Sequence, residues 1–494
     1  MTGQDPQYEG RMLIDGKLVN ALSGKQFANI NPATGAVIGH AADASPEDMS
    51  VAIGAARRAF DETDWSTNHA FRQRCLQQLQ TALRENADRF RDIQVAEAGL
   101  TTTTASGLIA NVTAGMSFMI DLCASYPYEK AYGKARVGKV DENRWVIKKP
   151  HGVAGLITAW NAPYLVTVWK MTPALAAGNC AVLKASPLAP FTATEIGRLI
   201  AERTDIPPGV INILTSGDRA EVGEALTGDP RVNMFSFTGS TKTGARVMQR
   251  AAEGIRKVEL ELSGKSANIL LDDADLDVAL PFSASMSCML SGQGCALPTR
   301  LLVPDSLYDQ VIERLSAQFK SMVVGDPRLA ETSVGPVISR DQQTRILDLI
   351  AQGKAAGSRL VVGGGTAQVE GRLQDGYWIQ PTLFADVAPD SVLAQTEIFG
   401  PVLSVIRYAS EDEAVRIANG TAFGLAAYIQ TRDAVRARAL ASKLRVGGVS
   451  LNGTVAFSHS DVPFGGVGIS GLGRKNGVEG FEEYLHSMLL VEPA

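Results

Sequence analysis

The stretch RVNMFSFTGSTKTGARVMQRAAEG, residues 231–254, runs from an apolar strand into a helix through a turn that contains Gly239 and Gly244. Ser240 or Thr241 is suited to cap this helix, because a hydroxyl can accept a hydrogen bond from one of its free backbone N–H groups. The remaining N–H groups would face an anion such as a pyrophosphate. Alone, a turn with two glycines is a weak signal of nucleotide binding.

The segments before this turn show the same alternation of short apolar runs and amphipathic helices. They are GVAGLITAW (152–160), CAVLKAS (180–186), FTATEIGRLIAERT (191–204) and GVINILTS (209–216). This order predicts βαβ units and a parallel, doubly wound sheet. Residues 46–126 begin with a helix start at Pro46 and are expected to form helices that pack on the same sheet.

A second series of the same kind begins after residue 263. Its segments are RLLVPDSLYDQVIERLSAQF (300–319), GPVLSVIRYASEDEAVRIAN (400–419), LAAYIQTRD (425–433) and GGVSLNG (447–453).

Residues 127–148 alternate apolar and polar side chains, which predicts an exposed pair of strands that must pair with something else. A chain of 494 residues is too long for one core, which stops growing at about 250 to 300 residues, so two or three domains are expected.

Composition excludes several kinds of partner. The net charge is −5 and no Lys/Arg run lies on one helix face, so nucleic acid is not an expected ligand. The N-terminal MTGQDPQYEG lacks targeting features and no segment has about 18 consecutive apolar residues, so we expect a cytoplasmic protein without a membrane partner. The five cysteines are scattered without a CxxC pair or a nearby histidine, so neither a disulfide framework nor a metal site is expected.

Three segments hold residues that could carry chemistry. In SGQGCALPTR, small neighbours would leave the sulfur of Cys295 accessible, although a lone cysteine is more often a packing residue. In LELSGKSAN, Glu261 ends an apolar strand, where loss of water would raise its pKa and its basicity; a glutamate pointing outward from a strand edge is at least as common. In ITAWNAPY, the amide of Asn161 could donate a hydrogen bond, but asparagine at such a place is usually only a turn former.

Together with other segments, these form an ordered set that resembles the aldehyde dehydrogenase superfamily: WNAP, VLKAS, FTGSTKTG, LELSGKS, GQGC, EIFGPV and PFGGVGISGLGR. Glu261 and Cys295 are 34 residues apart, which also fits that family. The resemblance extends from INPATG (30–35) to GFEEYL (480–485). It implies an α/β fold with a Rossmann-like cofactor domain, an α/β catalytic domain and a small β oligomerisation arm. The implied boundaries are 1–126 with 149–262 for the cofactor domain, 263–462 for the catalytic domain, and 127–148 with 476–494 for the arm.

The resemblance also implies a catalytic role for individual residues. Cys295 would attack the aldehyde carbon, and the side chain of Asn161 and the backbone N–H of Cys295 would bind the oxyanion. Glu261 would activate the water that hydrolyses the thioester to the carboxylic acid. Lys170 matches a lysine linked to a proton relay near the cofactor. The expected assembly is a homo-oligomer, a dimer or tetramer, in which the arm completes a sheet of a neighbouring subunit.

The implied cofactor is NAD, with NADP as an alternative. Relatives that prefer NAD commonly have glutamate three residues after the lysine of VLKAS, where it binds the ribose 2′-OH and repels a 2′-phosphate. This chain has Pro187 there, so the usual barrier to NADP is missing at that position. The residues implied to bind the cofactor are Trp160, Lys184, Ser186, Pro187, Gly239, Ser240, Gly244, Leu262, Glu397 and Phe399.

The glycine-rich C-terminal motif departs from the family pattern. Gly468 and Lys475 stand where relatives commonly have lysine and glutamate, and we assign them no role. Val478, followed by Glu479, stands where some relatives have a glutamate, so no second catalytic carboxylate is expected.

The predicted substrate residues are small beside the nucleophile and apolar further out, which predicts a wide, uncharged entrance. They are Ala162, Leu165, Val166, Trp169, Gly294, Ala296 and Phe457. We therefore expect a bulky, hydrophobic aldehyde, such as an aromatic, cyclic or terpenoid one. The alternative is a semialdehyde or a small aliphatic aldehyde.

Two other functions compete with this prediction. A CoA-acylating semialdehyde dehydrogenase would lack the glutamate base, whereas Glu261 is present. A catalytically silent binding protein with the same fold would have lost its nucleophile, whereas Cys295 is intact.

Overall fold

The strand and helix predicted within residues 231–254 are β10 (Met234–Thr238) and α8 (Thr241–Ala252). Ser240 is the residue that caps the helix, and its side chain accepts a hydrogen bond from the backbone N–H of Thr243 at 3.2 Å. The computed structural model describes residues 8–218 and 220–494. The first seven residues of the predicted cofactor domain therefore lie outside the described residues.

β10 belongs to an eight-stranded sheet in the order β2-β1-β9-β8-β7-β10-β11-β21. The strands from β9 to β11 are parallel. The chain passes from β7 through β8 to β9 on one side and then returns to form β10 on the other side of β7, so a topological switch point lies between β7 and β10. Ligands of open α/β sheets bind at the carboxyl ends of strands beside such a point. The other strands are β1 (Met12–Ile14), β2 (Lys17–Val19), β7 (Val153–Ile157), β8 (Cys180–Lys184), β9 (Ile211–Leu214), β11 (Lys257–Glu261) and β21 (Gly471–Leu472).

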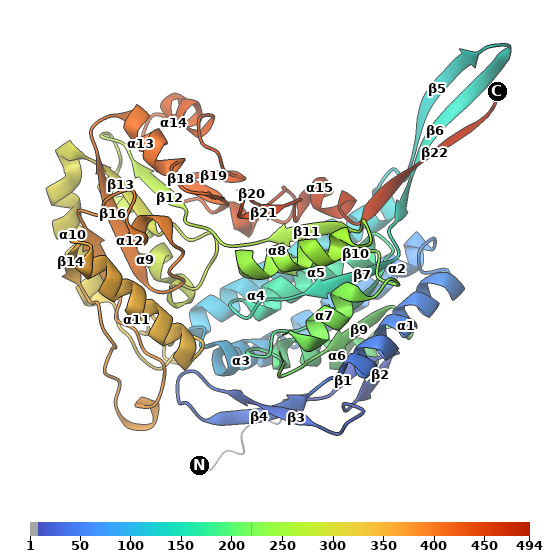
Figure 1. The fold of residues 1–494 in the computed structure, drawn as a ribbon, viewed down its shortest axis with the longest axis horizontal. Helices are drawn as coiled ribbons and strands as arrows, with labels where there is room; N and C mark the ends of the chain where they lie inside the picture. Colours follow the sequence, from blue (N-terminus) through green and yellow to red (C-terminus); the bar gives the residue numbers. More distant parts are fainter. Residues whose placement is uncertain (1–7, 219) are drawn as a thin grey trace.

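Helices cover both faces of this sheet (Figure 1). α1, α7 and α8 lie along one face, and α5 and α6 lie along the other, with α2, α3 and α4 packed behind them. The predicted helix start at Pro46 is the first residue of α1, which Ser45 caps. A hairpin of β3 (Gln26–Ile30) and β4 (Val37–Ala42) lies beside this body. The helices are α1 (Pro46–Glu62), α2 (His69–Glu85), α3 (Ala87–Ala98), α4 (Thr102–Ser125), α5 (Pro163–Ala176), α6 (Phe191–Arg203) and α7 (Glu221–Gly228).

α4 is the one helix in the described ranges that is long and apolar enough to cross a membrane, by length and composition alone. It packs against α2, α3 and α5. Its apolar side chains Ile109, Val112 and Met116 are buried in the core of the first sheet. The packing accounts for its apolar composition.

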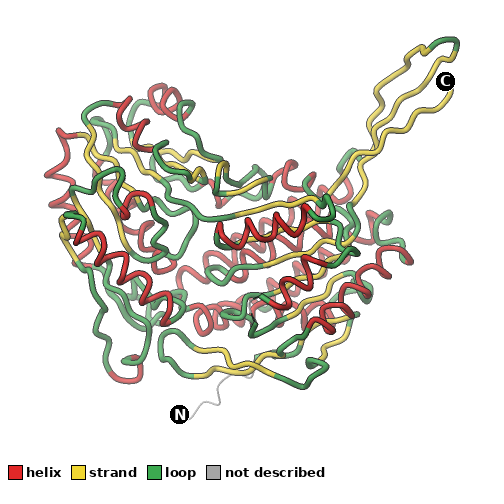
Figure 2. Tube along the Cα trace, in the orientation of Figure 1, coloured by secondary structure: helices red, strands yellow, loops and turns green. Residues whose placement is uncertain are grey.

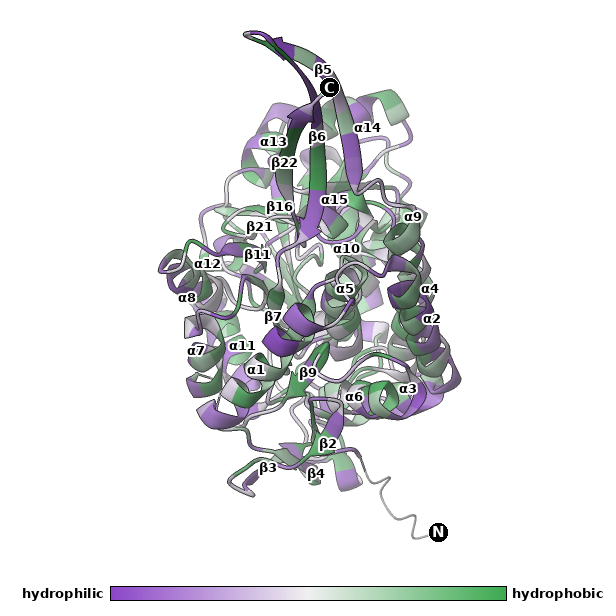
Figure 3. Ribbon diagram, turned by 90° about the vertical axis from the view of Figure 1, so that its right-hand side faces the viewer, coloured by the Kyte–Doolittle hydropathy of each residue, from purple (hydrophilic) through white to green (hydrophobic). Residues whose placement is uncertain are grey.

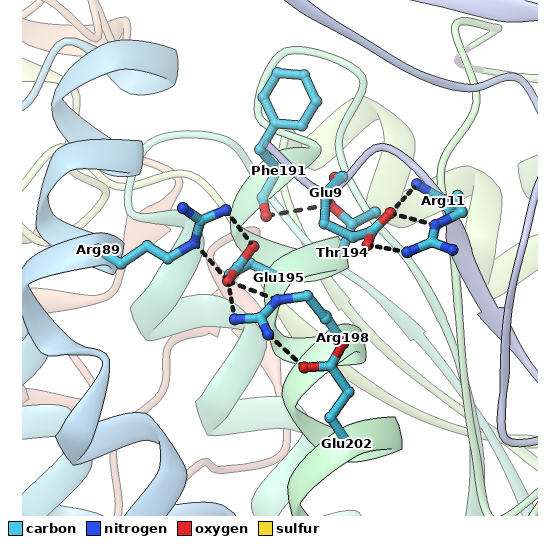
Figure 4. A network of polar contacts seen from close by, with 8 residues as sticks. All are labelled: Glu9, Arg11, Arg89, Phe191, Thr194, Glu195, Arg198 and Glu202. Carbon is cyan, nitrogen blue, oxygen red and sulfur yellow. Dashed lines mark hydrogen bonds and ion pairs between the residues drawn. The ribbon is translucent and has the colours of Figure 1, made fainter. Parts of the chain in front are cut away.

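A network of hydrogen bonds and ion pairs connects the N-terminal segment, α3 and α6 (Figure 4). The buried carboxylate of Glu195 accepts hydrogen bonds from Arg89 at 2.6 Å and from Arg198 at 2.6 Å. The hydroxyl of Thr194 donates to the backbone carbonyl of Glu9 at 2.6 Å. These contacts hold residues close to the N-terminus on the outer side of α6.

The second predicted α/β series forms a seven-stranded sheet in the order β14-β15-β16-β13-β12-β18-β19. All its neighbouring strands are parallel except β14, which pairs antiparallel with β15. Separate apolar clusters lie on its two faces. The strands are β12 (Ala267–Leu270), β13 (Arg300–Pro304), β14 (Arg359–Val362), β15 (Thr382–Ala385), β16 (Val402–Tyr408), β18 (Ala426–Gln430) and β19 (Gly448–Leu451). The helices are α9 (Leu276–Cys288), α10 (Tyr308–Ser321), α11 (Arg340–Ala355), α12 (Val392–Gln395), α13 (Glu411–Ala418) and α14 (Ala434–Ala441).

A three-stranded arm projects from this body (Figures 1 and 2). It contains β5 (Glu129–Val137), β6 (Val140–Pro150) and β22 (Leu485–Pro493) in the order β22-β6-β5. Figure 3 colours part of β6 as hydrophobic, and the exposed apolar side chains on the arm include Tyr132 and Leu489.

The C-terminal part of the arm is shorter than predicted. It begins at Leu485 rather than at residue 476, because α15 (Gly477–Glu482) packs against α4 and α5 of the body. Just before it, β21 pairs with β11 in the first sheet. A two-stranded ladder of β17 (Phe423–Gly424) and β20 (Val467–Gly468) lies in the same C-terminal region. The domain boundaries otherwise stay a prediction.

Candidate active site

The segment before Cys295 has an unusual backbone. Leu290 and Ser291 have φ values of 55° and 56°, and Gly292 follows with a φ of 73°. Such left-handed conformations are costly for residues with a side chain and are concentrated at functional sites. A Cβ at Gly292 would lie 2.0 Å from the carbonyl carbon of Gly400, so only glycine fits there. This backbone leads the chain out of α9 and brings the nucleophile to the first sheet.

Glu261 reaches the same place from the other domain, as the last residue of β11. The loop after it touches the cysteine loop, because a Cβ at Gly264 would lie only 2.1 Å from the carbonyl oxygen of Cys295. The Sγ of Cys295 lies 3.9 Å from Oε1 of Glu261, with the thiol as donor. The structure thus brings together the predicted nucleophile and the predicted base.

Burial governs the protonation of both groups. Glu261 is 4% exposed, and burial raises the pKa of its carboxyl to about 8. Its Oε2 has no hydrogen-bond partner in the described structure. Burial, followed by the nearby charges of Glu261 and Glu397, raises the pKa of the Cys295 thiol well above its usual range. The resting cysteine is therefore a thiol, and a base must remove its proton before it attacks.

Asn161 lies just beyond the end of β7, beside the cysteine loop. Its Nδ2 donates a hydrogen bond to the backbone carbonyl of Gln293 at 2.9 Å. The side chain of Gln293 is itself held, since its Nε2 donates to the carbonyl of Leu290 at 3.0 Å. A side-chain amide has two N–H bonds, so the second remains for an oxyanion formed at Cys295.

The predicted catalytic residue Lys170 is buried. It lines neither the apolar cavity nor the polar cleft that open on the two sides of Cys295 and are described below. Its Nζ donates to Oγ of Ser236 at 2.7 Å, and the hydroxyl of Ser236 donates to Glu259. Glu259 also binds Lys475, which does line the cavity beside Cys295. Neither Glu259 nor Lys475 was assigned a role from the sequence. The position of Glu259 two residues before Glu261 on a strand was the available signal, because such residues point to the same face.

An apolar cavity opens on one side of Cys295. It is lined by every one of the seven residues predicted to bind the substrate. Lining residues that the sequence analysis did not identify are Leu108, Thr238, Met289, Leu290, Leu297 and Phe464. Leu108 comes from α4, 53 residues before Asn161, so no local pattern could have pointed to it.

A larger, more polar cleft opens on the other side of Cys295, at the switch point between β7 and β10. Nine of the ten predicted cofactor residues line it. Gly244 does not, because it packs against Leu262, where a Cβ would lie 2.4 Å from the leucine side chain. The residues of the prediction that line the cleft are Trp160, Lys184, Ser186, Pro187, Gly239, Ser240, Leu262, Glu397 and Phe399.

The cleft fits a dinucleotide in two respects. The N-terminus of α8 offers free backbone N–H groups to a pyrophosphate. In addition, the hydroxyl oxygen Oγ1 of Thr238 is buried in the cleft wall and has no hydrogen-bond partner in the described structure, so a polar group of a bound dinucleotide could pair with it.

The far wall of the cleft is the loop after α12, which contains Glu397 and Phe399. Oε1 of Glu397 accepts a hydrogen bond from the backbone N–H of Gly264 at 2.9 Å. Gln342 donates to the backbone carbonyl of Phe399 at 2.8 Å, and the ring of Phe399 packs edge-on against Trp160 at 5.3 Å between ring centres. This loop is therefore fixed in place against both domains.

Within residues 8–218 and 220–494, no group of three or more His, Cys, Asp or Glu side chains is arranged to hold a metal ion.

Comparison with known proteins agrees with this geometry. A sequence profile described as the aldehyde dehydrogenase family matches residues 19–489. The 3-succinoylsemialdehyde-pyridine dehydrogenase of a Pseudomonas species is 40% identical over 96% of each chain.

Solved structures are similar over the whole chain. An aldehyde dehydrogenase of Mycobacterium tuberculosis complexed with NAD+ has a TM-score of 0.93 and 36% identity, and the match covers 99% of each chain. A betaine aldehyde dehydrogenase of Staphylococcus aureus in complex with NAD+ has a TM-score of 0.94 and 31% identity, covering 98% of this chain and 96% of that chain. These similarities confirm the predicted fold class and enzyme class. The chain belongs to the aldehyde dehydrogenase family.

Proposed function

We propose that this chain oxidises an aldehyde to its carboxylic acid with NAD+ or NADP+, using Cys295 as nucleophile and Glu261 as base. One observation carries the proposal. The Sγ of Cys295 and Oε1 of Glu261 lie 3.9 Å apart where an apolar cavity and a polar cleft meet. An aldehyde entering from the cavity and a dinucleotide bound in the cleft would reach the same sulfur from opposite sides.

The first step is formation of a carbon–sulfur bond. The proton of the Cys295 thiol is lost to water, and the resulting thiolate attacks the aldehyde carbon. Glu261, whose Oε1 lies 3.9 Å from the sulfur, is kept for the hydrolysis step. The aldehyde oxygen becomes an oxyanion, which the amide of Asn161 and the backbone N–H of Cys295 bind. A donor of this kind contributes about 3 to 4 kcal/mol to lowering the barrier.

The second step releases the product. Nicotinamide, when bound, supplies the acceptor for the hydride that leaves the former aldehyde carbon, and Cys295 then holds a thioester. Glu261 takes a proton from water, the hydroxide attacks the thioester carbon, and the carbon–sulfur bond breaks. The acid leaves and the cysteine is regenerated.

NAD is our first choice of cofactor. The two solved relatives described above bind NAD+. Pro187 lines the cleft three residues after Lys184, and proline offers neither a hydrogen-bond acceptor nor a negative charge to a ribose. NADP is therefore expected to support turnover as well.

For the substrate, we propose a bulky aldehyde with an uncharged tail. The cavity wall is formed largely by apolar side chains, including Leu165, Val166 and Trp169. Glu261 and Lys475 are the charged side chains that line it. The ammonium of Lys475 is already paired with Glu259, so it is not free to hold a substrate carboxylate.

The second candidate is a semialdehyde or a small aliphatic aldehyde. The names of the similar proteins, which include a semialdehyde and a betaine aldehyde dehydrogenase, favour this candidate over the first. The lining of the cavity favours the first.

The arm supports a proposal about assembly. Its outer strands are exposed and carry apolar side chains, and unpaired strands of this kind are usually covered by another chain. We propose a homo-oligomer, a dimer or a tetramer, that forms through the arm. Cytoplasmic location and the lack of nucleic-acid and membrane partners stay proposals from the sequence.

A substrate screen tests the proposed function. NADH or NADPH formation is measured with each cofactor and with benzaldehyde, a cyclic aldehyde, acetaldehyde, succinic semialdehyde and betaine aldehyde. Cys295→Ala serves as the blank. The proposal expects the highest kcat/KM with the first two aldehydes. A preference for the semialdehyde or acetaldehyde would support the second candidate, and no oxidation of any aldehyde would contradict the proposed activity.

A further inference from the structure

Glu259 and Glu261 lie on the same face of β11 but have very different surroundings. Oε1 of Glu259 lies 2.9 Å from Nζ of Lys475, and its Oε2 accepts hydrogen bonds from Lys475 at 3.1 Å and from Ser236. Lys170 adds a second ammonium 3.7 Å from Oε2. Glu261, by contrast, has one oxygen without any partner in the described structure.

The charges of this cluster can be assigned from its contacts. Burial alone would raise the pKa of Glu259, but the charges of Lys475 and Lys170 outweigh it and lower that pKa. Burial alone would lower the pKa of Lys475, but the charges of Glu259 and Glu261 outweigh it and raise that pKa. Burial and the charge of Lys475 lower the pKa of Lys170. Lys475 therefore keeps its ammonium form more strongly than Lys170 does.

Lys475 is also fixed beside the cavity that contains Glu261. Its backbone N–H donates to the carbonyl of Phe464 at 2.6 Å, and its carbonyl accepts from the N–H of Phe464 at 2.7 Å. Its side chain is 6% exposed and lines the same cavity as Cys295 and Glu261. The pairing with Glu259 keeps the ammonium at one place near the base.

We propose that Lys475 is a positioning residue for the base: its ammonium, held by Glu259, stabilises the carboxylate form of the buried Glu261. An isolated buried carboxylate is very costly unless an opposite charge lies close to it. This inference rests on the proposed role of Glu261 as the base. The other groups that face Glu261 are Glu259 on its own strand, Lys170 of α5 and the thiol of Cys295.

The direction of the effect on pH follows from these charges. Burial raises the pKa of Glu261 to about 8, and the positive charge of Lys475 is the largest influence that opposes this rise. Glu261 can accept a proton from water only as a carboxylate. Removing the charge of Lys475 therefore moves the pH dependence of hydrolysis to higher pH.

The test is a pH profile of thioester hydrolysis, measured in single-turnover experiments on the intact enzyme with benzaldehyde and NAD+. For Lys475→Met, we expect the midpoint to rise by about one pH unit, which is about a tenfold loss of hydrolysis rate at pH 7. The burst of NADH, which precedes hydrolysis, should keep its amplitude. For Lys475→Arg, which retains the charge, the midpoint should stay within about 0.3 units of the wild-type value.

Lys475→Met leaves Glu259 buried without its main partner, so the double variant Glu259→Gln/Lys475→Met is measured as well. It removes one charge of each sign, and we expect a midpoint between those of the wild type and Lys475→Met. A wild-type midpoint in Lys475→Met, or a loss of rate that is the same at every pH, would overturn the inference. If Lys475→Met does not fold, a double variant with a midpoint at or below that of the wild type would overturn it.

The base itself is tested separately. If Glu261→Gln hydrolyses the thioester at the wild-type rate, the proposed function fails at that step, whatever the Lys475 variants do.

Discussion

The cavity and the cleft that meet at Cys295 are built in different ways. The cavity is walled by side chains from helices and loops of both domains, such as Ala162, Val166 and Phe457. The cleft is walled largely by the ends of parallel strands and by the turn at Gly239 and Ser240. Selectivity for the aldehyde should therefore depend on side-chain volume and change with single substitutions. Binding of the dinucleotide should depend mostly on backbone groups and change at only a few positions.

The junction of the two regions should be the most sensitive place. Asn161→Ala removes the side-chain donor for the oxyanion, and we expect the rate of the NADH burst to fall about 10²- to 10³-fold. Rapid-mixing kinetics with saturating aldehyde measures this rate. A fall of less than about threefold would mean that the amide of Asn161 serves only to hold the carbonyl of Gln293.

The contact between the two loops of the junction is the next test. A methyl group at residue 264 would lie 2.1 Å from the carbonyl oxygen of Cys295 and must displace the nucleophile. We expect Gly264→Ala to lower kcat about a hundredfold. Gly107→Ala in α4 is the matched control, because a Cβ there meets no atom within 4 Å. Equal activity of the two variants would show that the loops do not need to touch.

In the cavity, Ala162→Phe should reduce kcat/KM for benzaldehyde about tenfold relative to acetaldehyde. Ala162 is 4% exposed and lines the cavity, so a larger side chain takes up space that a bulky substrate needs. The ratio of kcat/KM for the two aldehydes is the measurement. An unchanged ratio would contradict an aldehyde pocket controlled by side-chain volume.

In the cleft, the smallest effect is expected, at Pro187. Pro187→Glu introduces a carboxylate near the adenosine ribose, and we expect KM for NADP+ to rise several times more than KM for NAD+. Steady-state kinetics with both cofactors measures the ratio. Equal changes for the two cofactors would mean that residue 187 does not face the ribose.

The sequence predicted the cleft better than the groups behind the base. Ser240 caps α8 as expected, because strand-to-helix turns with a capping hydroxyl are a local feature of the chain. The family resemblance brought Glu261 and Cys295 together, although neither was a strong signal alone. Local patterns indicated the two sheets. They did not indicate the switch point of the first sheet, because that depends on the pairing of β7 with β10.

Lys475 could not be assigned a role from the sequence. It meets Glu259 across 216 residues, and neither segment by itself shows that the two side chains share one buried site. For the same reason, the sequence did not show that Lys170, expected in a proton relay near the cofactor, is bonded to Ser236. Contacts between distant segments need the packed structure, whereas capping and strand alternation do not.

The central claim is that Cys295 forms the thioester and Glu261 hydrolyses it. Its most direct test is the time course of NADH formation by Glu261→Gln when enzyme, benzaldehyde and NAD+ are mixed. The account predicts a burst of about one NADH per active site, followed by a stall, while Cys295→Ala forms none. Steady turnover of Glu261→Gln at the wild-type rate, or NADH formation by Cys295→Ala, would contradict it.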